Sequence, residues 1–343
     1  MPTTSPPTET PAPPPSAPSS ADDALHEQPG YAVQRTRLPR ILLMSIALLL
    51  LGALAAAGSL LLRLQGFDDA VRDQVLILRG FRLALGASTG ACLAVAGVLL
   101  QGLFRNPLAD PGIIGTGAGA VVGGLLGLLG WNLLHHHLGA WLAPEALLPL
   151  MCMLGALLAL LPVLAVLRFT RDTITVLLFG VVLTLFLSGV GSFLQHVAQE
   201  DWQLSRALAG FAAGDLGDKG AAHLALILPI LAGGMLAAWA WGRHLDLLLT
   251  GEEEAASLGV DLSRVQRWSI LWTALLVGAA VAVAGNVGFV GLMVPHIIRR
   301  LVGPGHRQLV PLAALGGASF VLCCDLLGQL PPPGRTLPLG VVT

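Results

Sequence analysis

Eight long stretches of this chain contain no Asp, Glu, Lys or Arg, and no other feature constrains its fold as strongly. Each holds roughly 17 or more residues, the length that an α-helix needs to cross the hydrocarbon core of a bilayer. Only 11% of all residues are charged and 55% are hydrophobic, which excludes the class of soluble globular domains. The stretches comprise residues 41–62, 83–104, 111–144, 146–167, 173–199, 220–242, 268–298 and 308–324.

The stretch 268–298 is too long for one ordinary helix, and it contains Gly285, Gly288 and Gly291 with Pro295 close behind. We therefore divide it into a full helix and a short segment that turns back near Gly285. With the N-terminus in the cytoplasm, this division places 12 of the 19 Lys and Arg residues inside, as the positive-inside rule favours. These are Arg35, Arg37, Arg40, Arg105, Arg168, Arg171, Arg243, Arg264, Arg267, Arg299, Arg300 and Arg307.

The sequence thus predicts an all-α, polytopic membrane protein with nine crossings over residues 41–343, and residues 338–343 resemble the start of a tenth helix. Residues 1–40 are rich in Pro, Ser and Thr and predict a disordered cytoplasmic tail. The formal net charge of -1 gives no sign of a nucleic-acid-binding surface. The four cysteines lie in apolar runs, where we interpret them as small hydrophobic residues.

Polar residues in such a chain indicate where function lies, because charges are costly inside a bilayer. The first polar region follows the second stretch: Asn106, Pro107, Asp110 and Pro111 interrupt the helix, and glycines at 115, 117 and 119 allow the next helix to pack closely. Taken alone, each of these residues is most simply part of a tight turn.

The second polar region is the loop 243–267, which contains a predicted short helix. Thr250 and Glu253 fit a capping box, three glutamates suit the first turn, and Gly259 suits a left-handed helix end. The helix either docks into a groove on a partner or is a solvated connection.

Two further features remain open on the sequence alone. Gly180, Thr184, Ser188 and Ser192 recur every four residues, with Gly191 and Gln195 beside them, and line either a water-accessible path or a packing seam between helices. Arg79 and Arg82 lie at the outer mouth of the second stretch, where they either bind an acidic partner or extend toward the membrane surface.

The sequence contains no recognisable motif for catalysis, nucleotide binding or zinc binding. The chain has no phosphate-binding loop that ends in Lys and Ser or Thr, no nucleophile elbow and no His-Glu-x-x-His zinc motif. His135, His136 and His137 point in different directions on a helix, so they do not predict a metal site. We expect no enzyme activity, no cofactor and no metal.

Three long motifs, in the same order, resemble the FecCD-type permeases of ABC importers from about Arg79 to Thr343. The first runs from Gln101 through the segment 105–111 to Ala120. The second is Gly251 to Gly259, and the third is the segment 285–296, which includes Gly288, Gly291, Pro295 and His296, followed by Arg299 and Gly303.

The resemblance implies ten helices per subunit, a homodimer with the pathway on its two-fold axis, and one cytoplasmic ATPase per subunit. It implies that Arg79 and Arg82 pair with glutamates of a periplasmic binding protein and that the stripe from Gly180 to Gln195 lines the pathway. The implied element for ATPase coupling comprises Glu252, Glu253, Glu254, Ala255, Ala256, Ser257, Leu258 and Gly259.

Two positions depart from the family pattern. Phe81 stands where a proline is usual between the two outer arginines, and Gln329 stands where a further arginine is typical after the acid Asp325. The tenth helix is expected after Thr343. The resemblance predicts uptake of an iron-siderophore complex across a bacterial inner membrane, with cobalamin or haem as alternative cargo. An ion-coupled secondary transporter and an intramembrane enzyme are alternatives from other classes.

Overall fold

The computed structural model describes residues 37–62, 68–112, 114–138, 144–169, 173–200, 202–217, 219–331 and 337–343. Residues 1–36, which include most of the predicted tail, lie outside the described part. The chain divides into residues 1–43 and the unit Met44–Thr343, and the following concerns the second unit. Throughout the described residues the regular structure is helical, without strands, which confirms the predicted fold class.

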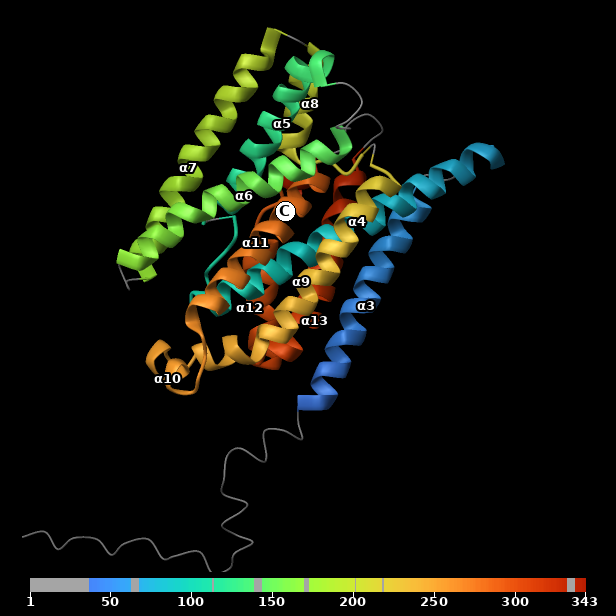
Figure 1. Ribbon diagram of the computed structural model, residues 1–343. Coiled ribbons are helices and arrows are strands. Elements are labelled where there is room, and N and C mark those ends of the chain that lie inside the picture. The colour runs from blue at the N-terminus through green and yellow to red at the C-terminus, as the bar shows by residue number, and fades with distance from the viewer. Residues whose placement is uncertain are drawn as a thin grey trace, which may run out of the picture. The chain divides into compact units, whose positions relative to one another are not determined.

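The described helices are α3 (Arg37–Leu61), α4 (Asp69–Leu103), α5 (Thr116–Leu138), α6 (Pro144–Phe169), α7 (Thr173–Val197), α8 (Trp202–Ala213), α9 (Ala221–Leu248), α10 (Glu252–Ser257), α11 (Leu262–Ala284), α12 (Val290–Val302), α13 (His306–Gln329) and α14 (Leu339–Val342), with a short 3-10 turn at Ala198–Glu200 (Figure 1).

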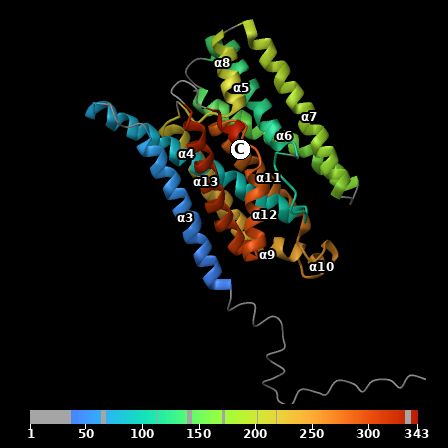
Figure 2. The same cartoon turned by 180° about the vertical axis from the view of Figure 1, so that it is seen from behind.

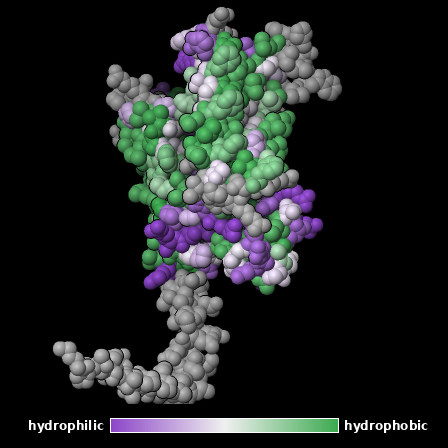
Figure 3. All heavy atoms as spheres, turned by 90° about the vertical axis from the view of Figure 1, so that its left-hand side faces the viewer, coloured by the Kyte–Doolittle hydropathy of each residue, from purple (hydrophilic) through white to green (hydrophobic). Residues whose placement is uncertain are grey.

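Eight of the described helices are long and apolar enough to cross a membrane: α3, α4, α5, α6, α7, α9, α11 and α13. The surface view shows a broad hydrophobic region, and hydrophilic residues gather below it at the end where Figure 1 places α10 (Figure 3). We call this the α10 end of the helix bundle and the opposite one the α8 end. A helical bundle with an apolar girdle satisfies its backbone groups internally, as a bilayer requires.

The long apolar stretch 268–298 is divided as predicted. α11 ends at Ala284, and Gly285 has φ +70°, a left-handed conformation that suits glycine. Phe289 then adopts φ 60° before α12, which contains 13 residues and is too short to cross a membrane by itself. Of the nine crossings that the sequence predicts, eight are long helices, and the ninth is this short returning helix, which does not cross by itself.

Glycines bring α4 against α12 and α13 at close range. A Cβ atom on Gly90 would overlap the carbonyl oxygen of Gly317 in α13, and one on Gly97 would overlap that of Gly291 in α12. Only glycine allows two helix backbones to approach so closely. α4 therefore runs through the middle of the bundle, between α9, α11 and α13 (Figures 1 and 2).

α7 lies at the edge of the bundle, and the two ribbon views agree on this (Figures 1 and 2). It packs on α5 and α6, and near its end Leu194 joins Leu125 of α5 and Leu208 of α8 in a small apolar cluster. Most of its outer side chains, such as Leu185 and Phe186, are exposed. One face of α7 is thus free for lipid or another subunit, and the other faces the bundle.

Candidate functional site

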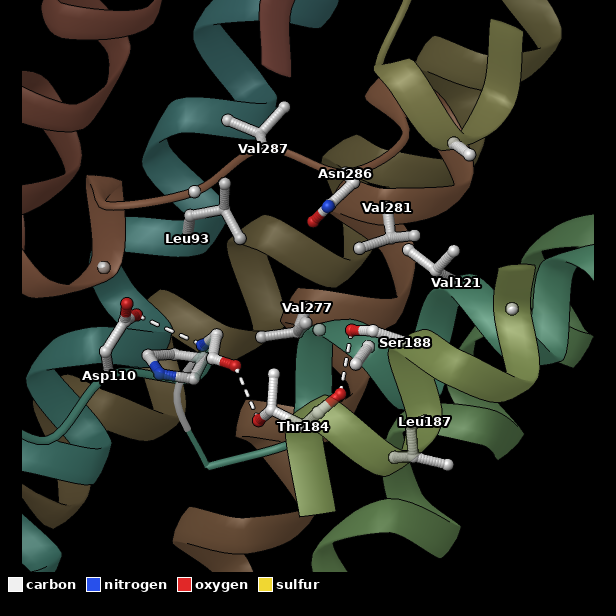
Figure 4. Close-up of a pocket in the computed structure, with 18 of the residues that line it drawn as sticks. Leu93, Asp110, Val121, Thr184, Leu187, Ser188, Val277, Val281, Asn286 and Val287 are labelled. Atoms are coloured by element: carbon white, nitrogen blue, oxygen red, sulfur yellow. Dashed lines mark hydrogen bonds between the residues drawn. The ribbon is translucent and has the colours of Figure 1, made fainter. Parts of the chain in front are cut away.

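A cavity of about 270 Å³ lies between α7 and the bundle. Its walls come from α4, α5, α7 and α11, from the loop that follows α4 and from the connection between α11 and α12 (Figure 4). Leu93, Val121, Val277 and Val281 supply apolar surface, while α7 contributes hydroxyl groups. Asp110 is the one ionisable side chain among the described residues that line it.

Five of the six residues of the predicted stripe line this cavity: Thr184, Ser188, Gly191, Ser192 and Gln195. Gly180 does not line it, and its carbonyl oxygen accepts a hydrogen bond from Thr184 Oγ1 at 2.9 Å. Ser188 and Ser192 donate to carbonyl oxygens four residues earlier, at 2.8 and 3.0 Å. Because the hydroxyl hydrogens are used within the helix, the stripe presents small, hydrogen-bonded groups to the cavity.

The loop after α4 forms the wall of the cavity next to Thr184 of the stripe. Asp110 is buried, and its Oδ1 accepts a hydrogen bond from the amide of Gly112 at 3.2 Å. Thr184 Oγ1 lies 3.2 Å from the Gly112 carbonyl oxygen, so the loop and α7 meet at this point (Figure 4). Burial raises the pKa of the Asp110 carboxyl to about 6, since the charged form loses its hydration.

The remainder of the first predicted motif builds the turn. Asn106 Oδ1 accepts from the amide of Leu108 at 2.9 Å, Pro107 is exposed, and Pro111 is buried beside Gly291. After the turn, a Cβ on Gly119 would lie 2.5 Å from the carbonyl oxygen of Gly155 in α6. The predicted close packing of the helix after Pro111 is confirmed by this approach.

The third predicted motif forms the other side of the cavity. Gly288 and Gly291 line it, and Pro295 lies buried inside α12. Pro295 has no N–H to donate to the carbonyl oxygen of Gly291, and Gln101 of α4 supplies donors instead, with its Nε2 3.4 Å from that oxygen and 3.2 Å from that of Leu292. His296 is half-buried, and its Nδ1 has no hydrogen-bond partner.

Asn286 also lines the cavity, although the sequence analysis did not name it as a lining residue. It stands exposed between the ends of α11 and α12, and in Figure 4 its amide points toward the cavity. A polar residue between two glycines at membrane depth was the available signal, because irregular backbone is tolerated there only beside protein or water.

The short helix of the 243–267 loop is present as α10, but the predicted capping box is wrong. Gly251, with φ 133°, precedes the first turn, and Thr250 Oγ1 donates instead to the carbonyl oxygen of Leu247 at 2.9 Å. Gly259 has φ 84°, which confirms the predicted left-handed end. Gly251 and Gly259, both with positive φ, begin and end α10, so this short helix is separate from α9 and α11.

The structure sorts the α10 residues into two groups. Ala255 is fully buried in this chain, and Glu252 Oε1 accepts from Arg105 at 3.2 Å, so both hold α10 on the bundle. The others are turned to solvent. They are Glu253, Glu254, Ala256, Ser257, Leu258 and Gly259.

Arg79 and Arg82 lie near the α8 end of α4 and already have partners in this chain. Arg82 makes a bidentate ion pair with Asp325 of α13, with contacts of 2.8, 3.0 and 3.2 Å. Arg79 donates to the carbonyl oxygens of Ser59 and Leu60, at the end of α3. Both positions continue the same helix, so Phe81 does not interrupt α4.

Gln329 takes part in the same network. Its Nε2 donates to Asp325 Oδ2 at 2.6 Å, and its Oε1 accepts from Ser59 Oγ at 3.2 Å. Asp325 is almost fully buried, so the two donors satisfy a carboxylate that would otherwise be costly. The network ties α3, α4 and α13 together at the α8 end.

Metal and thiol sites are not formed by the described residues. No group of three His, Cys, Asp or Glu side chains lies close enough to hold a metal ion within them. The four cysteines are unpaired, and Cys92, Cys152 and Cys324 are buried, as expected for small apolar residues. The side chains of His135, His136 and His137 lie outside the described part.

The arrangement is therefore a membrane bundle with a sparsely charged cavity along one peripheral helix and a small exposed helix at one end. The FecCD transport family matches residues 38–343. The chain belongs to this family. Its members are permease subunits of ABC importers of the metal-chelate, cobalamin and haem type, and the ATPase activity resides in a partner subunit.

Three relatives at 34–36% identity have names that specify different cargo. The cobalamin import system permease protein of Halobacterium salinarum is 36% identical over 280 residues, covering 81% of this chain and 72% of the relative. The hemin transport system permease protein of Yersinia pestis is 35% identical over 80% of this chain and 81% of its own length. The Fe(3+) dicitrate transport system permease protein of Escherichia coli is 34% identical, covering 76% and 78%.

A solved structure supports the same architecture. It is described as an inward-facing conformation of a metal-chelate type ABC transporter, and it matches with a TM-score of 0.70 at 27% identity. The match covers 87% of this chain and 94% of the solved one.

Proposed function

We propose that this permease carries an iron-siderophore complex across the bacterial inner membrane, with cobalamin or haem as alternative cargo in the same machinery. The cavity along α7 supports this proposal. A pathway for a large chelate needs a surface that does not hold the cargo tightly. The lining is mostly apolar side chains and hydroxyl groups that are already hydrogen-bonded, with Asp110, Gln195 and Asn286 as its other polar side chains. The cargo would pass along the stripe of α7 and past the loop at Gly112, on the two-fold axis of a homodimer.

We propose that α10 lies in the cytoplasm and is received by an ATPase subunit, which also places the N-terminus inside. The exposed residues of α10 support this, because they form a small, well-bounded surface that carries Glu253, Glu254 and Leu258. ATP hydrolysis in the partner would then move two copies of the permease relative to each other, and α7 offers a largely exposed face for the second copy.

The double substitution Glu253→Arg with Ala256→Trp tests the α10 proposal. Both side chains are exposed, so the fold is expected to survive, while a docked partner would meet a reversed charge and a bulky ring. We expect co-purification of the ATPase to fall at least tenfold. As the matched control, Gln203→Arg with Ala207→Trp alters exposed residues of α8 at the other end and should leave the ATPase bound. Unchanged co-purification of the α10 variant would refute the proposal.

We propose that Arg79 and Arg82 contribute to a docking surface for a substrate-binding protein. The side chain of Arg82 is about one-quarter exposed beside Asp325, so the pair offers a cation that is already positioned. Arg79→Gln and Arg82→Gln are expected to weaken binding in a salt-sensitive way, because steering between surface charges is screened by ions. If the variants bind the substrate-binding protein at low salt with the same affinity as the wild type, and their thermal stability is unchanged, the two arginines do not contribute to docking.

A further inference from the structure

A hydrogen-bonded pair of side chains, Asp246 and His306, joins α9 to α13 at the α10 end, away from the cavity. Asp246 Oδ1 lies 2.6 Å from His306 Nδ1 and also accepts from the backbone amide of His306 at 3.0 Å. His306 is the first residue of α13, so the carboxylate satisfies one of the free amides at the positive end of that helix. α10 begins six residues after Asp246.

The ring of His306 fits a slot made by two glycines. A Cβ on Gly102 of α4 would lie 2.5 Å from His306 Nε2, and a Cβ on Gly242 of α9 would lie 3.1 Å from His306 Cβ. The side chain is fully buried, and its Nε2 has no hydrogen-bond partner. The ring therefore fixes the relative positions of α4, α9 and α13 by shape as well as by the bond to Asp246.

α4 and α13 are joined at two further points along their length. They cross closely at Gly90 and Gly317, and at the α8 end Arg82 is held by Asp325. With the His306 slot, α4 and α13 form a pair that is joined near both of its ends and at its crossing. α10 is attached to it through the end of α9 at Asp246 and through the ion pair of Arg105 with Glu252.

We propose that His306 is a positioning residue through which movement of α10 reaches the α4–α13 pair. The inference rests on the proposed function, since it takes α10 as the element that the ATPase moves. Asp246 carries α10 at the end of α9, and His306 binds that end to α4 and α13. A displacement of α10 therefore shifts the whole pair, including its far end, against the peripheral helix α7.

The test measures a distance at the opposite end of the bundle. Spin labels are introduced through unnatural amino acids at Leu327 of α13 and Phe193 of α7, which are 53% and 63% exposed. The full permease is purified with its ATPase subunit, and the distance distribution is recorded without nucleotide and with ATP trapped by vanadate. We expect ATP to shift the distance in the wild type and the His306→Ala variant to lose at least half of that shift, with ATPase co-purification within twofold of wild type.

Two further variants separate this role from a general effect on packing. His306→Asn keeps an N–H donor near the position of Nδ1 and is expected to restore most of the shift. Arg307→Ala removes the cation–π contact with Trp239, at 5.1 Å, between the same two helices and is expected to respond as the wild type does. If His306→Ala does not fold, Asp246→Ala removes the same bond at a side chain that is about one-third exposed.

The outcomes distinguish the two levels of the proposal. A wild type that binds the ATPase and responds to ATP, together with His306→Ala and Asp246→Ala variants that respond equally, overturns the role of His306 and leaves the proposed function intact. A wild type that binds no ATPase overturns the proposed function, and the inference falls with it.

Discussion

α4 and α7 are both long, apolar helices, yet they lie in very different surroundings. In the most apolar 18 residues of α4, 83% of the residues are buried within the chain, against 17% for α7. α4 contacts its neighbours through glycines at backbone distance, whereas α7 contacts the bundle through apolar side chains such as Val176 and Leu194 and turns its small hydroxyl-bearing residues to a cavity. α4 is thus a helix packed on all sides, and α7 is a helix that contacts the bundle on one face.

This difference also explains where the cavity lies. Glycine crossings leave no space between α4, α12 and α13, because two backbones in contact exclude side chains from the seam. On the cavity-facing side of α7, Gly191, Ser188 and Ser192 are too small to fill the gap toward α4 and α11. A pathway is expected where a small-residue face meets apolar side chains instead of another glycine face.

The substitution Gly90→Leu should show the largest effect on the scaffold. Its side chain would have to occupy the space of the Gly317 carbonyl, so we expect a loss on the order of 5 kcal/mol or more and no folded protein in detergent. Gly80→Leu, in the same helix, is the matched control because nothing lies within 4 Å of its Cβ position. Size-exclusion profiles and thermal unfolding of the two variants compare them, and equal stability would contradict the account of the crossing.

Truncation of one leucine in each region sharpens the comparison further. Leu276 of α11 is fully buried, and Leu276→Ala is expected to reduce the free energy of unfolding by about 2–5 kcal/mol. Leu185 of α7 is 67% exposed, and the same truncation should change it by less than about 1 kcal/mol. Chemical unfolding in detergent measures both, and a larger loss for Leu185→Ala would show that α7 is part of the scaffold.

The buried carboxyl of Asp110 predicts a pH dependence of stability. Its pKa rises from 3.8 to about 6 on folding, so the folded protein binds more protons between these values and stability falls as pH rises through this window. At pH 7.5 Asp110→Asn should therefore be more stable than wild type by up to about 3 kcal/mol, and near pH 4 the difference should disappear.

Asp215→Asn is the control for this measurement. Asp215 Oδ1 accepts from the amide of Gly217 at 2.8 Å, in the same local turn as Asp110 with Gly112, but Asp215 is exposed. Thermal unfolding of both variants from pH 4 to pH 8 checks the prediction. A pH-independent difference between Asp110→Asn and wild type would mean that burial does not disfavour the charged carboxyl.

The smallest effect is expected for the ion pair of Arg105 with Glu252. Both side chains are about 40% exposed, so a double-mutant cycle with alanine should give a coupling of about 0.2–1 kcal/mol that decreases with added salt. A coupling above about 2 kcal/mol would show that α10 is held more tightly than its exposure indicates.

The sequence predicted those parts of the fold that depend on local composition. The length of the stretches without charged residues predicted the membrane helices, and Gly285 predicted the turn that separates α11 from α12. The four-residue spacing of the stripe predicted which side chains of α7 lie on one face, and five of the six line the cavity.

Contacts between distant segments could not be predicted in the same way. Arg82 and Asp325 are 243 positions apart, and Asp246 and His306 are 60 apart, so neither pairing follows from local spacing. The capping box failed because Gly251 adopts an extended conformation with positive φ, which turns the Thr250 hydroxyl away from α10 and toward Leu247. Burial of Ala255 against the chain itself was likewise invisible to a pattern of small residues.

ATP-dependent uptake into liposomes tests the central claim most directly. The permease, its ATPase and its binding protein are reconstituted, and uptake of cobalamin, haemin and ferric dicitrate is measured with ATP or with a proton gradient alone. We predict that at least one chelate is taken up. This uptake should require ATP, should not depend on the proton gradient and should be blocked by Ser188→Trp in the cavity. Uptake that follows the proton gradient, persists without ATP and is lost in Asp110→Asn would contradict the account and indicate a secondary transporter.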